Sequence, residues 1–179
     1  MVFAPDTETA LRSVVNLINT AANGDEHLAT MAQLDDFLTA ESFTGSRVRN
    51  SAEVASVREL RATLTTVWTA TEDQAVITVN ELLRNAKALP QLVKHDSWDW
   101  HVHATPAHAP LAERMATEAA MALIDVIRSK EMDRMLLCAA EDCDAFVLDL
   151  SRNRSKRYCD TGNCANRAHV AAYRARQRN

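Results

Sequence analysis

The four cysteines of this chain lie close together near its C-terminus, in two pairs of equal spacing. Cys138 and Cys143 form the first pair and Cys159 and Cys164 the second; each reads C-x4-C, and 15 residues separate the pairs. Structural zinc takes four thiolate or imidazole ligands in a tetrahedron, and one tight turn (a knuckle) can direct two cysteine sulfurs at one ion. The spacing therefore predicts one closed Zn²⁺ site with four thiolate ligands, which stabilises structure and leaves no open position for catalysis.

Two other uses of four cysteines fit less well. Disulfides need an oxidising compartment, and the N-terminal stretch MVFAPDTETALRS lacks the basic region and apolar core of a signal peptide. A redox dithiol normally has C-x-x-C spacing, which is absent. We therefore expect a cytoplasmic protein in a reducing setting, where zinc thiolates persist.

The charge of the chain is divided unevenly. Residues 151–179 hold eight basic residues and one acid, Asp160, and so carry +7, whereas the remainder has 12 basic and 23 acidic residues and carries −11. Such asymmetry is typical of a polyanion-binding end attached to an acidic body. The candidate nucleic-acid contacts are Arg152, Arg154, Lys156, Arg157, Arg167, Arg174, Arg176 and Arg178.

Charge alone does not name the partner. DNA phosphates attract such a patch, but a solvated tail, or a patch that docks on the protein's own acidic body, has the same composition. Within the predicted last helix, about residues 165–177, Arg167 and Arg174 share a stripe with Arg178 at i, i+7 and i+11. The sequence does not decide which arginine reads bases and which holds phosphate.

The rest of the chain must position this segment, and its composition favours helices. The 179 residues suffice for one ordinary domain and a small appendage. Only three glycines and 5% aromatic residues disfavour a large β-sheet. No apolar run reaches the length of a membrane span, so none is predicted. Helical spacing of apolar residues predicts amphipathic helices, which pack as a bundle, over residues 6–20, with Asp6 as the cap, 28–41, 51–70, 72–88 and 111–130.

A short hairpin is predicted between the fourth and fifth helices. Pro90 ends the fourth helix, and Gln91–Lys94 and Trp98–Ala104 read as its strands. The second strand alternates, with Trp98, Trp100 and Val102 on one face, which we expect to be buried, and His101 and His103 on the other.

The histidines are the only candidates for catalysis. His101, His103 and the nearby His108 could share a second metal, although surface histidines on a half-buried strand are commoner, and catalytic zinc needs three protein ligands. The sequence contains no H-E-x-x-H, phosphate loop or nucleophile–base motif. We therefore predict that the protein is not an enzyme.

The elements around the cysteines predict a treble-clef-like finger. The fifth helix is expected to continue or resume through Met132–Leu137 and deliver Cys138. A strand at Phe146–Leu148 is expected to pair with Lys156–Tyr158, and the second knuckle to open the last helix. Phe146, Leu148, Tyr158 and Val170 would form the small core. So small a unit needs its metal for stability.

From Cys138 to Gln177 the sequence resembles the CGNR zinc finger, named for the four residues at its second knuckle. It shares both C-x4-C knuckles, the basic helix and an F-x-x-D-x-S-R-N run made of Phe146, Asp149, Ser151, Arg152 and Asn153. Upstream, VVNLINT, VRELRATL and VNELL resemble the mostly helical ABATE domain that usually precedes this finger. The resemblance implies a helical domain over residues 1–131 and a CGNR-type finger over 132–179.

The resemblance also implies a function: a bacterial, stress-related transcription regulator whose finger binds DNA. Ala165 departs from the family, which has glycine there, and indicates a helical position in this chain. We therefore expect a mainly α protein that binds zinc and DNA. The alternative is a protein-interaction module in which the finger is a structural clip. The acidic helical part is a candidate for binding a small-molecule effector or for forming a homodimer.

Overall fold

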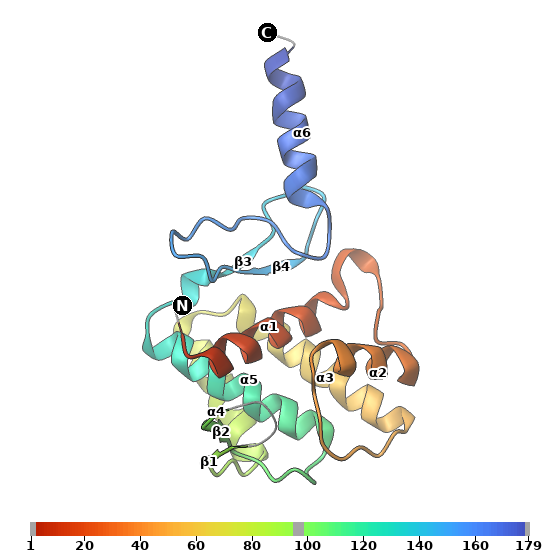
Figure 1. Cartoon of the computed structure of the whole chain (residues 1–179), viewed down its shortest axis with the longest axis vertical. Helices are drawn as coiled ribbons and strands as arrows, with labels where there is room; N and C mark the ends of the chain where they lie inside the picture. The colour runs from red at the N-terminus through yellow and green to blue at the C-terminus, as the bar shows by residue number, and fades with distance from the viewer. Residues whose placement is uncertain (1–2, 95–98, 178–179) are drawn as a thin grey trace.

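The computed structural model describes residues 3–94 and 99–177. A helical body forms one end of the molecule, and a small finger with a projecting helix forms the other (Figure 1). The body comprises α1 (Pro5–Asn19), the 3-10 turn η1 (Ala22–Gly24), α2 (Met31–Ala40), α3 (Ser51–Trp68), α4 (Glu72–Asn85), β1 (Gln91–Val93), β2 (His101–His103) and α5 (Leu111–Arg128). The finger follows as η2 (Met132–Arg134), β3 (Met135–Leu137), β4 (Phe146–Leu148) and α6 (Cys164–Gln177).

The helix starts follow local capping chemistry. Thr30 and Thr71 each form a capping box with the glutamine three residues on, and Asn50 caps α3. The predicted Asp6 cap is wrong, because α1 begins one residue earlier, with Pro5 at its first position. Proline suits that position because its missing N–H would have no helical partner there.

The body core forms between amphipathic helices, with α5 against α1, α3 and α4. Leu11, Leu34, Leu64 and Leu123 are almost completely buried in it. Val76, an apolar residue of the amphipathic fourth helix and therefore expected to be buried, is exposed. That helix ends at Asn85 and presents Ala75 and Val79 to the core, so Val76 lies beside the buried stripe.

The predicted hairpin is present, but its faces are the reverse of those expected. β1 pairs antiparallel with β2, so that Leu92 faces Val102 and Val93 faces His101. Trp100 is 67% exposed, and Leu92 and Val102 are exposed too, whereas His101 and His103 are half-buried. Alternation in a strand shows which residues share a face and not which face meets the body; Trp98 lies outside the described residues.

The finger's strands also differ from the prediction. Met135–Leu137 forms a strand rather than a helical continuation, and it pairs antiparallel with Phe146–Leu148. Lys156–Tyr158 is not a strand. Pairing β4 with β3 buries Met135 and Leu148 in the body core, which a partner strand at Lys156–Tyr158 would not do. A short apolar run fits a helix or a strand equally well by pattern.

The fold class is nevertheless confirmed: the described chain is mainly helical, with a short hairpin in the body and a cysteine-bearing finger at its end. Within residues 3–94 and 99–177, no helix combines the length and the apolar character needed to cross a membrane.

Candidate metal centre

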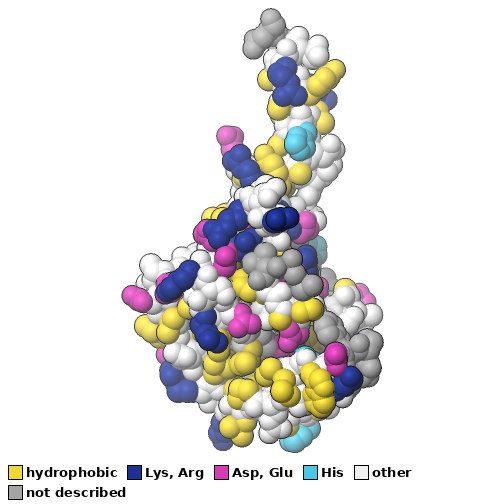
Figure 2. Space-filling view, turned by 60° about the vertical axis from the view of Figure 1, so that its left-hand side comes forward, with side chains coloured by type: hydrophobic (Ala, Val, Ile, Leu, Met, Phe, Trp, Pro, Cys, Tyr) yellow, Lys and Arg dark blue, Asp and Glu magenta, His cyan; other side chains and the backbone are white. Residues whose placement is uncertain are grey.

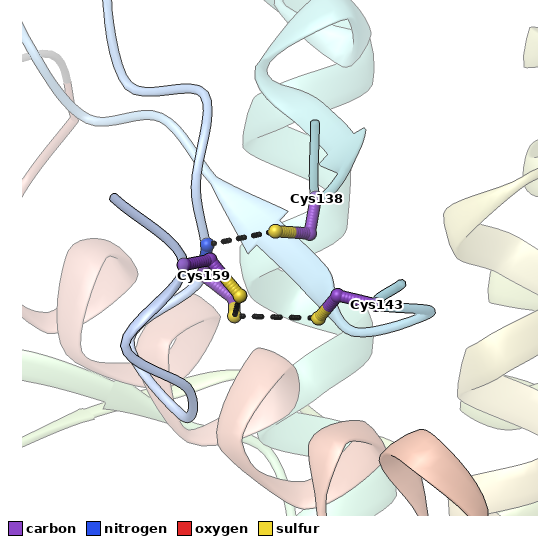
Figure 3. Close-up of side chains that lie close together, drawn as sticks. Cys138, Cys143 and Cys159 are labelled. Carbon is purple, nitrogen blue, oxygen red and sulfur yellow. Dashed lines mark hydrogen bonds between the residues drawn. The ribbon is translucent and has the colours of Figure 1, made fainter. Parts of the chain in front are cut away.

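The two knuckles bring all four cysteine sulfurs together. The Sγ atoms of Cys138, Cys143, Cys159 and Cys164 lie within 4.8 Å of one another. Cys159 Sγ is 3.7 Å from Cys143 Sγ (Figure 3), and it is also 3.7 Å from Cys164 Sγ. Four sulfurs bound tetrahedrally at the usual Zn–S distance of about 2.3 Å lie about 3.8 Å apart, whereas disulfide sulfurs lie about 2.0 Å apart. The geometry fits one tetrathiolate metal ion and excludes a disulfide in this state.

The centre is shielded from water. Cys138, Cys159 and Cys164 are buried, and Cys143 is half-buried. Ala145 and Val147 pack with them in a small apolar cluster separate from the body core. Phe146 and Leu148 were expected in this small core of the finger, but Val147 lies there instead. Side chains alternate along β4, so Phe146 and Leu148 point toward the body.

The environments of the thiols differ. Burial raises the pKa of Cys143 to about 12. At Cys159 burial acts in the same direction, but hydrogen bonds from the Thr161 side chain and the Gly162 N–H outweigh it and lower the pKa to about 7. Ligand thiols lose their protons when a metal binds, and the hydrogen bonds from Thr161 and Gly162 favour the thiolate of Cys159.

Gly162 has a steric role that the sequence pattern did not reveal. A Cβ at this position would lie 3.2 Å from Cys164 Sγ and 3.8 Å from Cys159 Sγ. Glycine thus leaves room for two converging sulfurs within the second knuckle.

Arg167 joins the two knuckles. Its guanidinium donates to both carboxylate oxygens of Asp142, at 2.8 and 3.1 Å, and to Cys164 Sγ at 3.2 Å. Asp142 lies inside the first knuckle and Arg167 on the first turn of α6. Four thiolates around Zn²⁺ carry a formal charge of −2, and a guanidinium on the sulfur offsets part of it. The structure places this predicted nucleic-acid residue against the metal centre.

Asp149 organises the loop that follows β4. Its buried carboxylate accepts from the backbone N–H groups of Ser151, at 2.8 Å, and Lys156, at 3.0 Å. Burial opposes the charge, but these bonds and the Ser151 hydroxyl lower the pKa of Asp149. Arg134 donates to the carbonyls of Asp149 and Ser151 from the other side. The loop is therefore fixed in place without pairing as a strand.

Side chains of the body hold the finger by its strands. Asn19, at the end of α1, donates to the Phe146 carbonyl at 2.9 Å and accepts from the Phe146 N–H at 2.7 Å, as a neighbouring strand would. Asn23 and Asp144 make a similar reciprocal pair. Trp68 donates to the Leu136 carbonyl and packs edge-on against Phe146. These contacts attach the finger that carries the metal centre to the body.

The predicted basic residues separate into two groups. Arg154 pairs with Glu131 and Asp133, Lys156 with Asp160, and Arg167 with Asp142. The second group is exposed and makes no ion pair with any residue in the described ranges. It consists of Arg152, Arg157, Arg174 and Arg176. Arg178 lies outside the described residues. Basic side chains of both groups face solvent over the finger and along the projecting helix (Figure 2).

Helix α6 stands clear of the molecule. It leaves the second knuckle and extends away from the body (Figure 1). From Ala165 to Gln177 all residues are exposed except Ala168, which is partly covered. Val170, predicted to join the core, is 39% exposed, and Tyr173 is 58% exposed. The prediction for Val170 is wrong because the helix does not fold back onto the strands. Ala165 is helical, as its identity indicated.

The three candidate histidines do not form a three-ligand metal site in the described structure. His101 Nε2 and His103 Nε2 lie 2.9 Å apart on one face of β2. Among the described residues, the four cysteines are the only group of three or more side chains arranged to hold a metal, so His108 does not complete a site with the pair.

An open hollow of about 410 Å³ is present on the body. It lies at the start of α3 and is lined by Met31, Arg49, Val54 and Arg58, among others. Both arginines already pair with carboxylates, Arg49 with Asp35 and Arg58 with Glu26. Effector binding there stays a prediction.

Comparison with family models assigns both parts of the chain. Residues 11–130, about two thirds of the sequence, match the ABATE family, described as "putative stress-induced transcription regulator". The chain belongs to the ABATE family. Residues 134–177 match the CGNR zinc finger. Neither family is one of enzymes. Among curated proteins, none matches this ABATE-family chain.

Proposed function

We propose that this ABATE-family protein is a cytoplasmic transcriptional regulator that binds one zinc ion through its four cysteines and duplex DNA through α6 and the adjoining loop. Zinc supplies the tetrahedral centre that orders both knuckles. The chain's own residues then support α6: Arg167 joins its first turn to Asp142 of the first knuckle, and Asn19 and Asn23 of the body bind Phe146 and Asp144 of the finger.

One observation carries the DNA proposal: an exposed basic helix that nothing in the described chain covers beyond its first turn. Residues 164–177 carry three arginines and no acid. Arg174 and Arg176 have no internal ion pair in the described part of the chain, and neither do Arg152 and Arg157 of the loop. Cations that are not neutralised within the protein remain available for phosphates, which release counterions on binding.

The test is the affinity of the zinc-loaded chain for duplex DNA, followed by fluorescence anisotropy over a range of salt. The Arg174→Ala/Arg176→Ala double variant is expected to weaken binding on every sequence and to reduce the salt slope by about 2, since each phosphate contact contributes about 0.9. Arg84→Ala/Arg128→Ala is the matched control, because these arginines are also exposed in the last turns of helices, α4 and α5.

If the zinc-loaded protein does not bind duplex DNA at low salt, the DNA-binding proposal is contradicted. The alternative, a protein-interaction module, then remains. The metal is tested separately: one zinc ion per folded chain is expected, and Co²⁺ substitution should give the absorption of a tetrahedral thiolate site. A finger that stays folded in metal-free protein at neutral pH would contradict the zinc proposal.

The body's contribution, sensing an effector or forming a homodimer, belongs to the same proposal. It is supported by the division into an acidic body and a basic finger and by the regulator family of the body. Sedimentation of the zinc-loaded chain tests the dimer directly.

A further inference from the structure

Helix α6 has the dimensions of a helix that reads DNA. Its 14 residues span about 21 Å, and a helix with side chains is about 10–12 Å across. The major groove of B-DNA is about 12 Å wide and admits one α-helix. Since nothing in the described chain covers α6 beyond its first turn, its whole outer length can enter such a groove.

One face of the helix carries side chains suited to base edges. Asn166, Val170, Tyr173 and Gln177 recur at i, i+4, i+7 and i+11 and form one stripe, named here the reading stripe. All four are exposed. Asparagine and glutamine amides can bond adenine N6 and N7 together, and apolar groups contact the thymine methyl. The stripe therefore has the chemistry to recognise A·T base pairs.

The free arginines lie on either side of this stripe. Successive residues of an α-helix are about 100° apart around the axis, which places Arg174 about 70° to one side of the stripe and Arg176 about 90° to the other. With the stripe toward the floor of the groove, the two side chains reach toward opposite phosphate backbones. Arg167 is excluded from this role by its bonds to Asp142 and Cys164.

We propose that α6 lies in the major groove with the reading stripe toward the bases and selects sites rich in A·T pairs. This proposal rests on the DNA-binding function proposed above and adds its specificity. The stripe covers about 16 Å of helix length, or about five base pairs. A second copy of the chain is a poorer occupant, because paired α6 helices would bring together arginines with no acid on either helix to offset them.

The experiment is selection of binding sites from a random duplex library by the full-length, zinc-loaded protein. A recovered site with a run of about five A·T-rich positions is expected. Gln177→Ala should then lose about tenfold in discrimination at one adenine and leave affinity for unrelated duplex unchanged. Tyr173→Ala should relax a neighbouring position. His169→Ala is the matched control, since His169 is exposed on the same helix but lies off the stripe.

Three outcomes would overturn the specificity. If the protein binds duplex DNA but selection recovers no sequence preference, base recognition by α6 is contradicted and the proposed function stands. If the protein binds no duplex, both proposals are contradicted. If neither Gln177→Ala nor Tyr173→Ala changes the preferred DNA sequence, the bases are recognised by residues outside the stripe. Loss of a zinc-loaded dimer with Tyr173→Ala, with site preference unchanged, identifies the stripe as a contact between copies.

Discussion

Polar side chains complete the backbone of the finger where regular structure ends. Asn19 pairs with both backbone groups of Phe146, and Asp149 accepts two N–H groups of the following loop. An unpaired buried N–H or carbonyl costs about as much as a lost hydrogen bond. These residues thus permit a two-stranded sheet and a tight loop in a unit too small for a large core.

Arg167 is expected to act on zinc affinity. Its guanidinium donates hydrogen bonds to both carboxylate oxygens of Asp142 and to the Cys164 sulfur. Residues that hydrogen-bond to metal ligands typically contribute 10–100-fold to metal affinity. Arg167→Ala should weaken zinc binding by about that factor, measured by competition with a chromophoric chelator. Arg167→Lys should recover part of it, because a lysine keeps the charge but not the bidentate geometry.

Arg174→Ala is the control for that measurement. Arg174 is exposed on the same helix and makes no ion pair in the described ranges, so its removal should leave the zinc affinity unchanged. Equal zinc affinities for Arg167→Ala and Arg174→Ala would show that the Asp142 clamp does not support the metal centre.

Glu26 is expected to give the body a pH-dependent stability. Arg61 donates to both of its carboxylate oxygens, at 2.8 and 2.6 Å, and lowers the pKa of Glu26 to about 2. Because the folded pKa is depressed, the stabilisation is present above about pH 4.5 and is lost as the pH falls toward 2. At pH 7 Glu26→Gln should lower the free energy of unfolding by about 2 kcal/mol.

The comparison is made by urea unfolding of the parent and Glu26→Gln between pH 7 and pH 3. The difference between the two should shrink as the pH falls, and any loss of metal in acid affects both proteins alike. Glu59→Gln is the control, since Glu59 is exposed on α3 and forms no ion pair within the described chain. A difference that stays constant with pH would contradict the assignment.

At the scale of elements, β4 divides its residues between two cores. Val147 packs with the cysteines, and Leu148 packs with the body. Leu148→Ala should lower the free energy of unfolding of the metal-free body by about 2–5 kcal/mol. Val147→Ala should leave that value unchanged and weaken zinc binding by about tenfold, since two methyl groups are worth about 1.5 kcal/mol.

Urea unfolding of the metal-free proteins and chelator competition measure the two effects. Effects of similar size for both variants on the metal-free body would show that β4 does not separate the cores. Val76→Ala, at an exposed position of α4, is expected to change neither quantity.

The sequence predicted most elements, and its errors share a cause. Long amphipathic runs identified α1 to α5, because a helix needs several turns of consistent pattern. The last helix was expected instead from the order of elements in the finger. The strands are three residues each, too short for alternation to decide partner or face. The pattern therefore predicts helix at Met135–Leu137, a strand at Lys156–Tyr158 paired with Phe146–Leu148, and a buried Trp100, and all three predictions are wrong. Each was decided by tertiary contacts that local pattern does not contain.

The candidate site was predictable only where it depends on residues close together in the sequence. Paired cysteine spacing is local, so the convergence of the four sulfurs could be foreseen. The eight basic residues could be counted, but their separation into paired and free groups depends on acids elsewhere, such as Glu131 for Arg154 and Asp142 for Arg167. Asn19 gave no signal, because its partner Phe146 is 127 positions away in sequence.

At the scale of the whole molecule, the body and the projecting helix differ in what stabilises them. The body has its own apolar core, in which β3 and β4 take part through Met135 and Leu148. Helix α6 has no tertiary packing beyond its first turn, and an isolated helix of 14 residues is marginal in water. A metal ion held at its N-terminal end would then be the main restraint on α6, so the two parts should respond differently to metal.

Removal of zinc by a chelator should therefore unfold the finger beyond β4 and leave the body folded. Hydrogen exchange resolved by peptide is the measurement: amides of residues 164–177 should lose protection, while those of α1 and α5 keep theirs. Cys138→Ser/Cys143→Ser should reproduce the pattern without chelator, and added zinc should restore the parent but not this variant. Protection of α6 that survives chelation, or loss of protection throughout the body, would show that the metal does not act locally as the four converging sulfurs and the two separate cores indicate.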